Sequence, residues 1–550
     1  MPKHAGLLSG LNNSILRGLN RKAIRSCSDW ALQYRVMGPP YPGPWTFAHH
    51  PWLRGMHDSE AEHVVGRKAA QMGYSEYCLN TCLYRMDMYG ESVLYVLPTT
   101  DPDASGFSSS RFDPALELSE HLEQMFTDVK NVGHKRAGTA SLFVRGSKSR
   151  SQMKTLPVGV LILDEMAEME QKNVPLAVER LSGQVNKKRI DVSTPTHEGK
   201  NIDEEWQNSS QNYFHFKCPC CGRSTQLTYP ECLVIIGDSL TDPRLKESYI
   251  QCKECKGRLN HSGKPEWLSQ GFWVPSYQDR PIEGFYVSQL YSMTISPSAL
   301  AESYFRAQTN LAHEQEFYNS KLGLPHTPEG ARITDNDIAS CIGDYKRGTT
   351  ALRDGVVTMG VDVGKWLHFE ICQWRFDKSV KKVTDLNLLA VPRVIMADKV
   401  KDFEQLDQIM AQYKVKYTIV DAQPEKRKAI EFCQRHHGRA RICYYSQGIG
   451  RIIRQHKDDP AVTVDRTTWM DLALGRFYSR KIVLPIDICN EYKEHLKTPV
   501  RLYKEDKDGN PVGRYQIGEN DQDHFAHSRT YCEIALLQAL GTVGNSDIIG

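Results

Sequence analysis

The sequence predicts a mixed α/β protein with two large domains and a small cysteine-rich insertion in the first. In the first half, the apolar run from Val160 to Leu163 ends in two adjacent acids and is typical of a buried parallel strand. Later in the first half stand two CxxC pairs, and in the second half two more apolar runs each end in an aspartate. A chain of 550 residues is long enough for several folding units of about 150 residues.

These features set the expected domain limits. We expect an N-terminal arm over residues 1–40, a first α/β domain over 41–345, a second over 346–540 and a tail over 541–550. The cysteine-rich insertion is expected at about 214–260, inside the first domain.

Composition excludes a membrane-spanning protein. Hydrophobic residues make up 40% of the chain and charged residues 25%, and no window approaches 18 uninterrupted apolar residues. The N-terminus lacks the apolar segment of a secretory signal, so we expect a cytoplasmic protein. The fifteen cysteines then favour free thiols or metal ligands over disulfides. The net charge of +3 says little about nucleic acid by itself.

The two acids after the first buried strand are Asp164 and Glu165. Parallel strands bind ligands at their carboxyl ends, where these acids lie. In an enzyme that hydrolyses a nucleoside triphosphate, the first acid would hold Mg²⁺ and the second would polarise the attacking water. The alternative is a buried strand that runs into an acidic helix N-terminus. Ser193 and Thr194 end another apolar strand, where they could sense the γ-phosphate and couple it to movement, or form a simple turn.

A loop upstream of the acid pair has the spacing of a phosphate-binding loop. The segment GRKAAQMGYSE, residues 66–76, keeps the glycine and hydroxyl positions of GxxxxGK[ST], but Tyr74 occupies the usual lysine position. Gly73 would let the backbone approach phosphate, Ser75 would reach Mg²⁺, and Lys68 would fold its ammonium over the phosphate oxygens. The alternative is an amphipathic helix that contains a glycine.

A basic loop precedes the acid pair. The segment from Arg145 to Lys154 contains four basic residues and no acid. Arg150 and Lys154 are candidates for a DNA contact or an arginine-finger role, and a solvated loop is the alternative.

The cysteine-rich insertion has the pattern of a structural zinc site. Its two CxxC pairs are Cys218 with Cys221 and Cys252 with Cys255. Four thiolates fill the tetrahedral shell of Zn²⁺ and leave no position open for catalysis. Cys220 lies inside the first pair and could compete as a ligand, while free buried thiols are the alternative.

Three aspartates of the second half could form a two-metal centre. Asp362 and Asp421 end apolar strands, and Asp523 stands at the start of an amphipathic helix. Such acids can hold two Mg²⁺ or Mn²⁺ ions about 4 Å apart for in-line phosphodiester hydrolysis, although each alone is usually a surface residue or helix cap. Residues 425–457 carry nine Lys or Arg against two Glu, as expected for contacts to a phosphodiester backbone.

The order of these motifs, KAAQMGYSE, LILDE, STP, the CxxC pairs and GVDVG…IVDA…DHFAH, resembles the large terminase subunit of tailed phages, in the lambda-like GpA family. The resemblance covers roughly residues 30–540. It implies a P-loop ATPase domain of the ASCE type with an inserted zinc ribbon, followed by an RNase H-like α/β nuclease domain. The implied activity is ATP-driven packaging of DNA into a procapsid and cleavage of the DNA concatemer.

The resemblance also assigns residues. It implies that Lys68, Gly73, Tyr74 and Ser75 form the ATP-binding loop, that Asp164 binds Mg²⁺, and that Glu165 is the catalytic base. Asp362 and Asp421 match the first two nuclease acids. Asp523 matches the third, with Asp521 as the alternative, and His527 stands where many relatives carry another aspartate. Gln71 leaves no arginine in the loop for a finger in cis.

The implied partners are double-stranded viral DNA, the small terminase subunit, the portal protein of the procapsid and further copies of the same chain. The implied location is the host cytoplasm, with transient docking on the procapsid. One alternative is a DNA-binding assembly protein with a degenerate ATP site, which Tyr74 supports. Another is a transposase-like or integrase-like nuclease, which would not need the motifs of residues 66–196.

Overall fold

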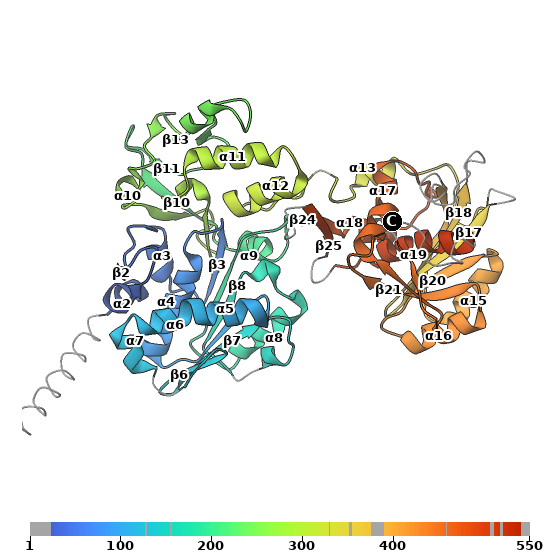
Figure 1. Ribbon diagram of the computed structural model, residues 1–550, viewed down its shortest axis with the longest axis horizontal. Coiled ribbons are helices and arrows are strands. Elements are labelled where there is room, and N and C mark those ends of the chain that lie inside the picture. The colour runs from blue at the N-terminus through green and yellow to red at the C-terminus, as the bar shows by residue number, and fades with distance from the viewer. Residues whose placement is uncertain are drawn as a thin grey trace, which may run out of the picture. The chain divides into compact units, whose positions relative to one another are not determined.

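The chain forms two compact units, and the division between them lies between Thr327 and Pro328 (Figure 1). The computed structural model describes residues 24–126, 129–154, 157–328, 330–350, 355–375, 390–450, 452–457, 459–505, 511–517 and 521–540. Among these residues, no helix combines the length and the apolar character needed to cross a membrane.

The first unit is built on a sheet in the order β11-β10-β16-β3-β9-β8-β4-β7-β6-β5, with β15 paired to β10. The strands from β10 to β7 in this order run parallel, and the outer pairs are antiparallel. The strands are β3 (His63–Lys68), β4 (Val93–Leu97), β5 (Val129–Asn131), β6 (His134–Ala137), β7 (Ala140–Gly146), β8 (Val160–Asp164), β9 (Lys188–Ser193), β10 (Asn212–Lys217), β11 (Ser224–Thr225), β15 (Phe272–Pro275) and β16 (Glu283–Val287).

Helices cover both faces of this sheet, so its central strands are apolar on both sides. In β8, Val160 and Ile162 belong to one hydrophobic core, while Leu161 and Leu163 belong to the other. The helices of the first core are α2 (Cys27–Tyr34), α3 (Leu53–His57), α4 (Tyr74–Tyr89), α6 (Asp113–Glu117) and α7 (Glu120–Met125), and those of the second are α8 (Val174–Val178) and α9 (Ile202–Asn208).

The segment between β10 and β15 forms a small body with its own sheet. Its strands β12 (Leu233–Val234), β13 (Tyr249–Gln251) and β14 (Arg258–Leu259) are antiparallel, and α10 (Lys264–Trp267) follows. Leu233, Ile250 and Leu259 of these strands are buried in the hydrophobic core of the first unit. The first unit ends with α11 (Pro297–Ala307) and α12 (Leu311–Glu316).

The second unit has a seven-stranded sheet in the order β19-β18-β17-β20-β21-β23-β22. The first three strands are antiparallel, and β17, β20, β21 and β23 run parallel. The strands are β17 (Val356–Val363), β18 (Leu367–Arg375), β19 (Val391–Val400), β20 (Tyr417–Asp421), β21 (Ala440–Ser446), β22 (Arg454–Gln455) and β23 (Ala461–Asp465), with a separate hairpin of β24 (Val500–Glu505) and β25 (Pro511–Gln516).

The last described helix, α19 (His524–Ala539), lies directly on β17. A side chain at Gly360 would come within 2.1 Å of the Ser528 carbonyl oxygen, so only glycine allows this approach. The remaining helices of the unit are α13 (Asp335–Ala339), α15 (Phe403–Gln412), α16 (Lys426–Arg435), α17 (Arg466–Tyr478) and α18 (Asn490–Lys497).

Two predicted limits differ from the structure. The predicted domain boundary at residue 345 lies too late, because Ile333, Ile338 and Cys341 are buried in the core of the second unit. The predicted arm is partly wrong, because Trp30 of α2 is fully buried in the first unit. Residues 1–23 of the arm and the tail 541–550 lie outside the described residues.

Candidate active sites

Three polar strand ends meet at one edge of the first sheet. Strands β3, β9 and β8 are parallel neighbours, and they end at Lys68, Ser193 and Asp164. Glu165 follows Asp164 in a left-handed backbone conformation, with φ of 61°. The structure therefore brings together the candidates that the sequence placed about one hundred residues apart.

Glu165 is held between the other two strands. Its Oε1 lies 2.8 Å from the Lys68 ammonium, and its Oε2 lies 3.4 Å from the Ser193 hydroxyl, which makes a shorter hydrogen bond of 2.8 Å to the Thr194 carbonyl. The Ser193 Oγ also accepts a hydrogen bond from the Ala167 N–H. Thr194 follows directly on Ser193 and is partly buried. A displacement of the Glu165 side chain would therefore change its contact with Ser193, the last residue of β9.

Asp164 is buried beside this pair. Burial raises the pKa of Asp164 to about 6, with a further increase from the charge of Glu165. The Tyr95 hydroxyl donates a 2.6 Å hydrogen bond to Oδ2. Within the described residues Oδ1 accepts no hydrogen bond of ordinary geometry, although Ser75 is close enough to lower the pKa. A buried carboxylate oxygen without a donor beside a serine suits a divalent cation.

The phosphate-loop segment forms a strand, a turn and a helix, which rejects the alternative of a continuous amphipathic helix. Gly73 has a φ of 82° and precedes α4, and Ser75 lies in the first turn of that helix. Tyr74 was also expected in the ATP-binding loop, but its side chain is packed into the protein. It is buried against Gly66, and its hydroxyl donates to the Phe285 carbonyl at 3.4 Å. Any contact of Tyr74 with phosphate must come from its main chain.

The sequence analysis found no chemistry in residues 265–345, yet part of this region supports the loop. The N–H of Ala70 donates to the Ser320 carbonyl at 2.8 Å, and the Gln289 side chain donates to the Ala70 carbonyl at 3.0 Å. Gly323 has a φ of 66°, and a Cβ there would lie 2.6 Å from the Ala69 nitrogen. The turn KLGLP was the available signal, but its contact with the loop is long-range.

The basic loop follows β7, four strand positions from β3 at the same edge of the sheet. Arg150 and Lys154 are both exposed there. The structure does not bring them to Lys68 or Glu165 within the contacts it defines.

The four predicted cysteines form one cluster. One sulfur from each of Cys218, Cys221, Cys252 and Cys255 lies within 4.8 Å of the others. A hydrogen bond from a backbone N–H at Arg223 lowers the pKa of Cys221 to about 7. Cys220 is exposed and its thiol points to the Arg258 carbonyl at 3.7 Å, so it does not compete.

A second polar edge lies in the second unit. Val361 of β17 is paired with Val420 of β20 in parallel register, which places Asp362 and Asp421 side by side. Burial raises the pKa of Asp421 to about 6, and the charge of Asp362 raises it further. Asp523 precedes α19, is buried, and lies 3.1 Å from His527. Asp521 is half-exposed.

Two histidines at this edge received no role in the sequence analysis. His524 Nδ1 lies 2.7 Å from Asp362 Oδ2, and this hydrogen bond raises the pKa of His524. His368 of β18 stacks on His524, with ring centroids 4.4 Å apart. Burial opposes ionisation of Asp523, but the charge of His527 holds its pKa at about 2. No motif in the sequence marked His368, which lies in β18 together with the polar residues Glu370 and Gln373.

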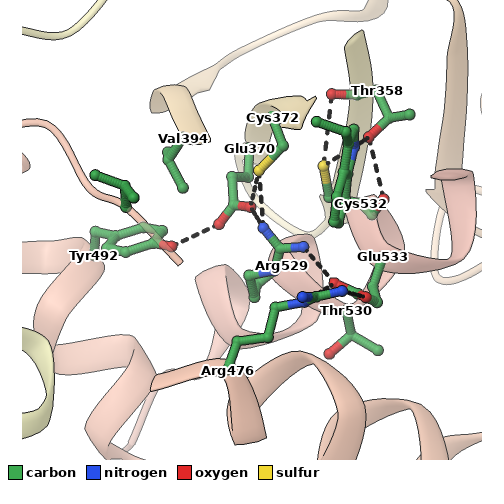
Figure 2. Close-up of polar contacts among 12 residues, drawn as sticks. Thr358, Glu370, Cys372, Val394, Arg476, Tyr492, Arg529, Thr530, Cys532 and Glu533 are labelled. Atoms are coloured by element: carbon green, nitrogen blue, oxygen red, sulfur yellow. Dashed lines mark hydrogen bonds and ion pairs between the residues drawn. The ribbon is translucent and has the colours of Figure 1, made fainter. Parts of the chain in front are cut away.

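A buried network of charges fixes α19 against β18 behind this edge (Figure 2). Arg529 of α19 pairs with Glu370 of β18, and its other end pairs with Glu533 at 2.7 Å. Glu533 also pairs with Arg476 of α17, and the Tyr492 hydroxyl donates to Glu370 at 2.6 Å. All of these charged side chains are buried, so the network holds the elements that carry Asp362 and Asp523 in one register.

The two edges define an α/β nucleotide hydrolase joined to an α/β phosphodiesterase with a carboxylate-rich centre. Family comparison agrees with both halves. Residues 40–273 match the model of the phage terminase large subunit gpA, ATPase domain, and residues 282–475 match that of the terminase large subunit gpA, endonuclease domain. The chain belongs to the gpA family of phage terminase large subunits, with ATPase and DNA endonuclease domains.

The chain is similar to solved structures at low sequence identity. The HK97 bacteriophage large terminase is 10% identical with a TM-score of 0.50, over 92% of this chain and 99% of that one. A large terminase from a thermophilic bacteriophage is 11% identical with a TM-score of 0.32, over 90% of this chain and 99% of that one. No curated protein matches the chain.

Proposed function

We propose that Lys68, Asp164 and Glu165 carry the ATP hydrolysis of the first domain, in a P-loop fold of the ASCE type. The observation that carries the proposal is the meeting of these side chains at one edge of a parallel sheet, beside the turn of Gly73. Asp164 and Ser75 would hold Mg²⁺, which neutralises phosphate charge when bound.

Each residue then has a distinct task. The Lys68 ammonium leaves Glu165 and binds the phosphate oxygens of ATP, and the freed Glu165 carboxylate accepts a proton from the attacking water. The Ser193 hydroxyl contacts Glu165 and the N–H of Ala167. A displacement of the Glu165 side chain would therefore alter contacts at the end of β9, next to Thr194. This contact couples hydrolysis to movement of DNA.

We further propose that Asp362, Asp421 and Asp523 form the endonuclease centre, in an RNase H-like sheet of three antiparallel strands followed by parallel ones. Two Mg²⁺ or Mn²⁺ ions, when bound, would activate water and stabilise the leaving oxygen. Asp362 and Asp421 are held by neighbouring strands, and Asp523 by the start of α19. Asp523 is favoured over Asp521 because it is buried.

The cysteine cluster is proposed as a zinc ribbon. Four sulfurs from two chain turns suit one tetrahedral Zn²⁺, and β12, β13 and β14 are only two or three residues long. The metal would therefore be structural.

The proposed substrate is double-stranded viral DNA, packaged into a procapsid in the host cytoplasm. The proposed partners are the small terminase subunit, the portal protein, and further copies of this chain in the motor. Arg150, Lys154 and the basic residues of 425–457 would contact the DNA backbone, and Arg150 could serve a neighbouring copy as an arginine finger.

One assay tests the proposal. The purified chain is incubated with ATP, Mg²⁺ or Mn²⁺, and plasmid DNA, and phosphate release and DNA cutting are scored separately. We expect DNA-stimulated ATP hydrolysis and metal-dependent cutting. An assembly protein with a degenerate ATP site would release no phosphate, and a transposase-like nuclease would cut without hydrolysing ATP.

A further inference from the structure

Asp362 lies beside two histidines that the proposed reaction does not use. His368 is the cross-strand partner of Asp362 in the β17–β18 pair, so both side chains lie on the same face of the sheet. His524 approaches that face from α19 and contacts Asp362 at 2.7 Å. One ligand atom from each of the three residues lies within 4.8 Å of the other two.

His368 is the residue that most needs a partner. It is 4% exposed, and neither ring nitrogen makes a hydrogen bond to the described residues. Its Nε2 lies 3.6 Å from Glu491, but both oxygens of that carboxylate bind the Lys399 ammonium at 2.6 and 2.8 Å. A buried, unpaired imidazole is costly, and coordination of a cation would satisfy it.

We propose that Asp362, His368 and His524 form a mixed carboxylate–imidazole metal site within the nuclease centre. The proposal rests on the nuclease function proposed above, because Asp362 serves both. Asp523 turns toward His527 and Arg466, which leaves His524 as the side chain from α19 that faces Asp362.

The ligand types set the metal preference. Oxygen-only centres suit Mg²⁺, whereas imidazole nitrogen raises affinity for Mn²⁺ and more strongly for Co²⁺ or Zn²⁺. The buried pair of Glu370 and Arg529 ties β18 to α19 and so fixes the spacing of His368 and His524 (Figure 2). Its two imidazole ligands should make the site bind Mn²⁺, Co²⁺ or Zn²⁺ in preference to Mg²⁺.

Manganese binding to the metal-free full chain tests this proposal without any activity assay. Free Mn²⁺ is counted by electron paramagnetic resonance, and spin-echo modulation detects a nitrogen ligand on bound Mn²⁺. We expect nitrogen modulation in the wild type. We expect His524→Ala to remove it and to weaken Mn²⁺ binding by about tenfold or more. His368→Ala should weaken both signals.

Two further variants separate the outcomes. His524→Asp should keep Mn²⁺ bound while the nitrogen signal falls, and His437→Ala, at an exposed position, should match the wild type. Mn²⁺ binding that depends on Asp362 but shows no nitrogen signal would overturn the mixed site and leave the nuclease proposal standing. Binding that is unchanged in Asp362→Ala would overturn the nuclease centre itself.

Discussion

The Lys68 ammonium and the Glu165 carboxylate form an ion pair in the absence of nucleotide, with 2.8 Å between the two charged atoms. ATP must therefore compete with Glu165 for Lys68 before hydrolysis begins. In the proposed mechanism, the same exchange frees Glu165 to act as a base. At the residue scale, one contact would thus link nucleotide binding to the release of the proposed catalytic base.

Glu165→Gln should lower ATP turnover by at least about 100-fold while nucleotide binding is retained, because the amide cannot accept the proton. Phosphate release and binding of a fluorescent nucleotide measure the two effects. Glu179→Gln, at an exposed position, is the control. Wild-type turnover in Glu165→Gln would show that another group is the base.

Asp421 should make the metal-free nuclease unit less stable above pH 6. Its folded pKa of about 6 lies above the ordinary value of 3.8, so the cost of ionisation is absent below pH 4 and complete above pH 6. We expect Asp421→Asn to raise the free energy of unfolding at pH 8 by on the order of 2 kcal/mol, and to change nothing at pH 4. Denaturant unfolding in EDTA checks this.

The exposed Asp344→Asn is the matched control and should leave the unfolding midpoint unchanged at both pH values. An equal gain for Asp421→Asn at pH 4 and pH 8 would contradict the raised pKa.

Single elements depend on interactions that their own residues cannot supply. The strands β12, β13 and β14 are two or three residues long, and two of the four clustered thiols, Cys252 and Cys255, lie between β13 and β14. Helix α19 instead depends on buried ion pairs from two other elements. Such pairs contribute little net stability, but loss of one partner leaves an unpaired charge in the core.

The cysteine cluster should hold one Zn²⁺ per chain, measured as metal content of protein purified without added zinc. Cys252→Ser should reduce this content and increase protease cleavage within residues 216–260, because four thiolates are needed to close the site. Cys220→Ser is the matched control, since its thiol points away from the cluster. A chain without zinc and with four freely titrating thiols would contradict the zinc ribbon.

Glu370→Gln should destabilise the second unit by about 3–5 kcal/mol, because it leaves the buried Arg529 and Arg476 to share Glu533 as their one counter-charge in the network. Thermal unfolding of the second unit provides the measurement. Asp335→Asn removes an acid from an ion pair in which its side chain is 81% exposed, and it should cost less than about 1 kcal/mol. Equal effects of the two variants would mean that the network does not hold α19.

At the scale of the whole molecule, the sequence predicted the two α/β units, the strand ends that carry Asp164, Asp362 and Asp421, and the cluster of four cysteines. These features are local, since each depends on a short apolar run or a fixed spacing. The domain boundary near residue 328, the burial of the Tyr74 side chain and the position of His368 beside Asp362 could not be predicted in this way. Each of them depends on packing against elements that are distant in the sequence.

The central claim is that the chain carries two independent chemical centres. Lys68 and Glu165 belong to the first unit, whereas Asp362 and Asp421 belong to the second, and no candidate residue serves both. A change in one metal site should therefore spare the chemistry of the other.

The most direct test measures ATP hydrolysis and plasmid cutting side by side in Asp362→Ala and Asp421→Ala. We predict that both variants lose cutting in Mg²⁺ and in Mn²⁺ while hydrolysing ATP at the wild-type rate. Plasmid cutting by both variants at the wild-type rate would contradict the account.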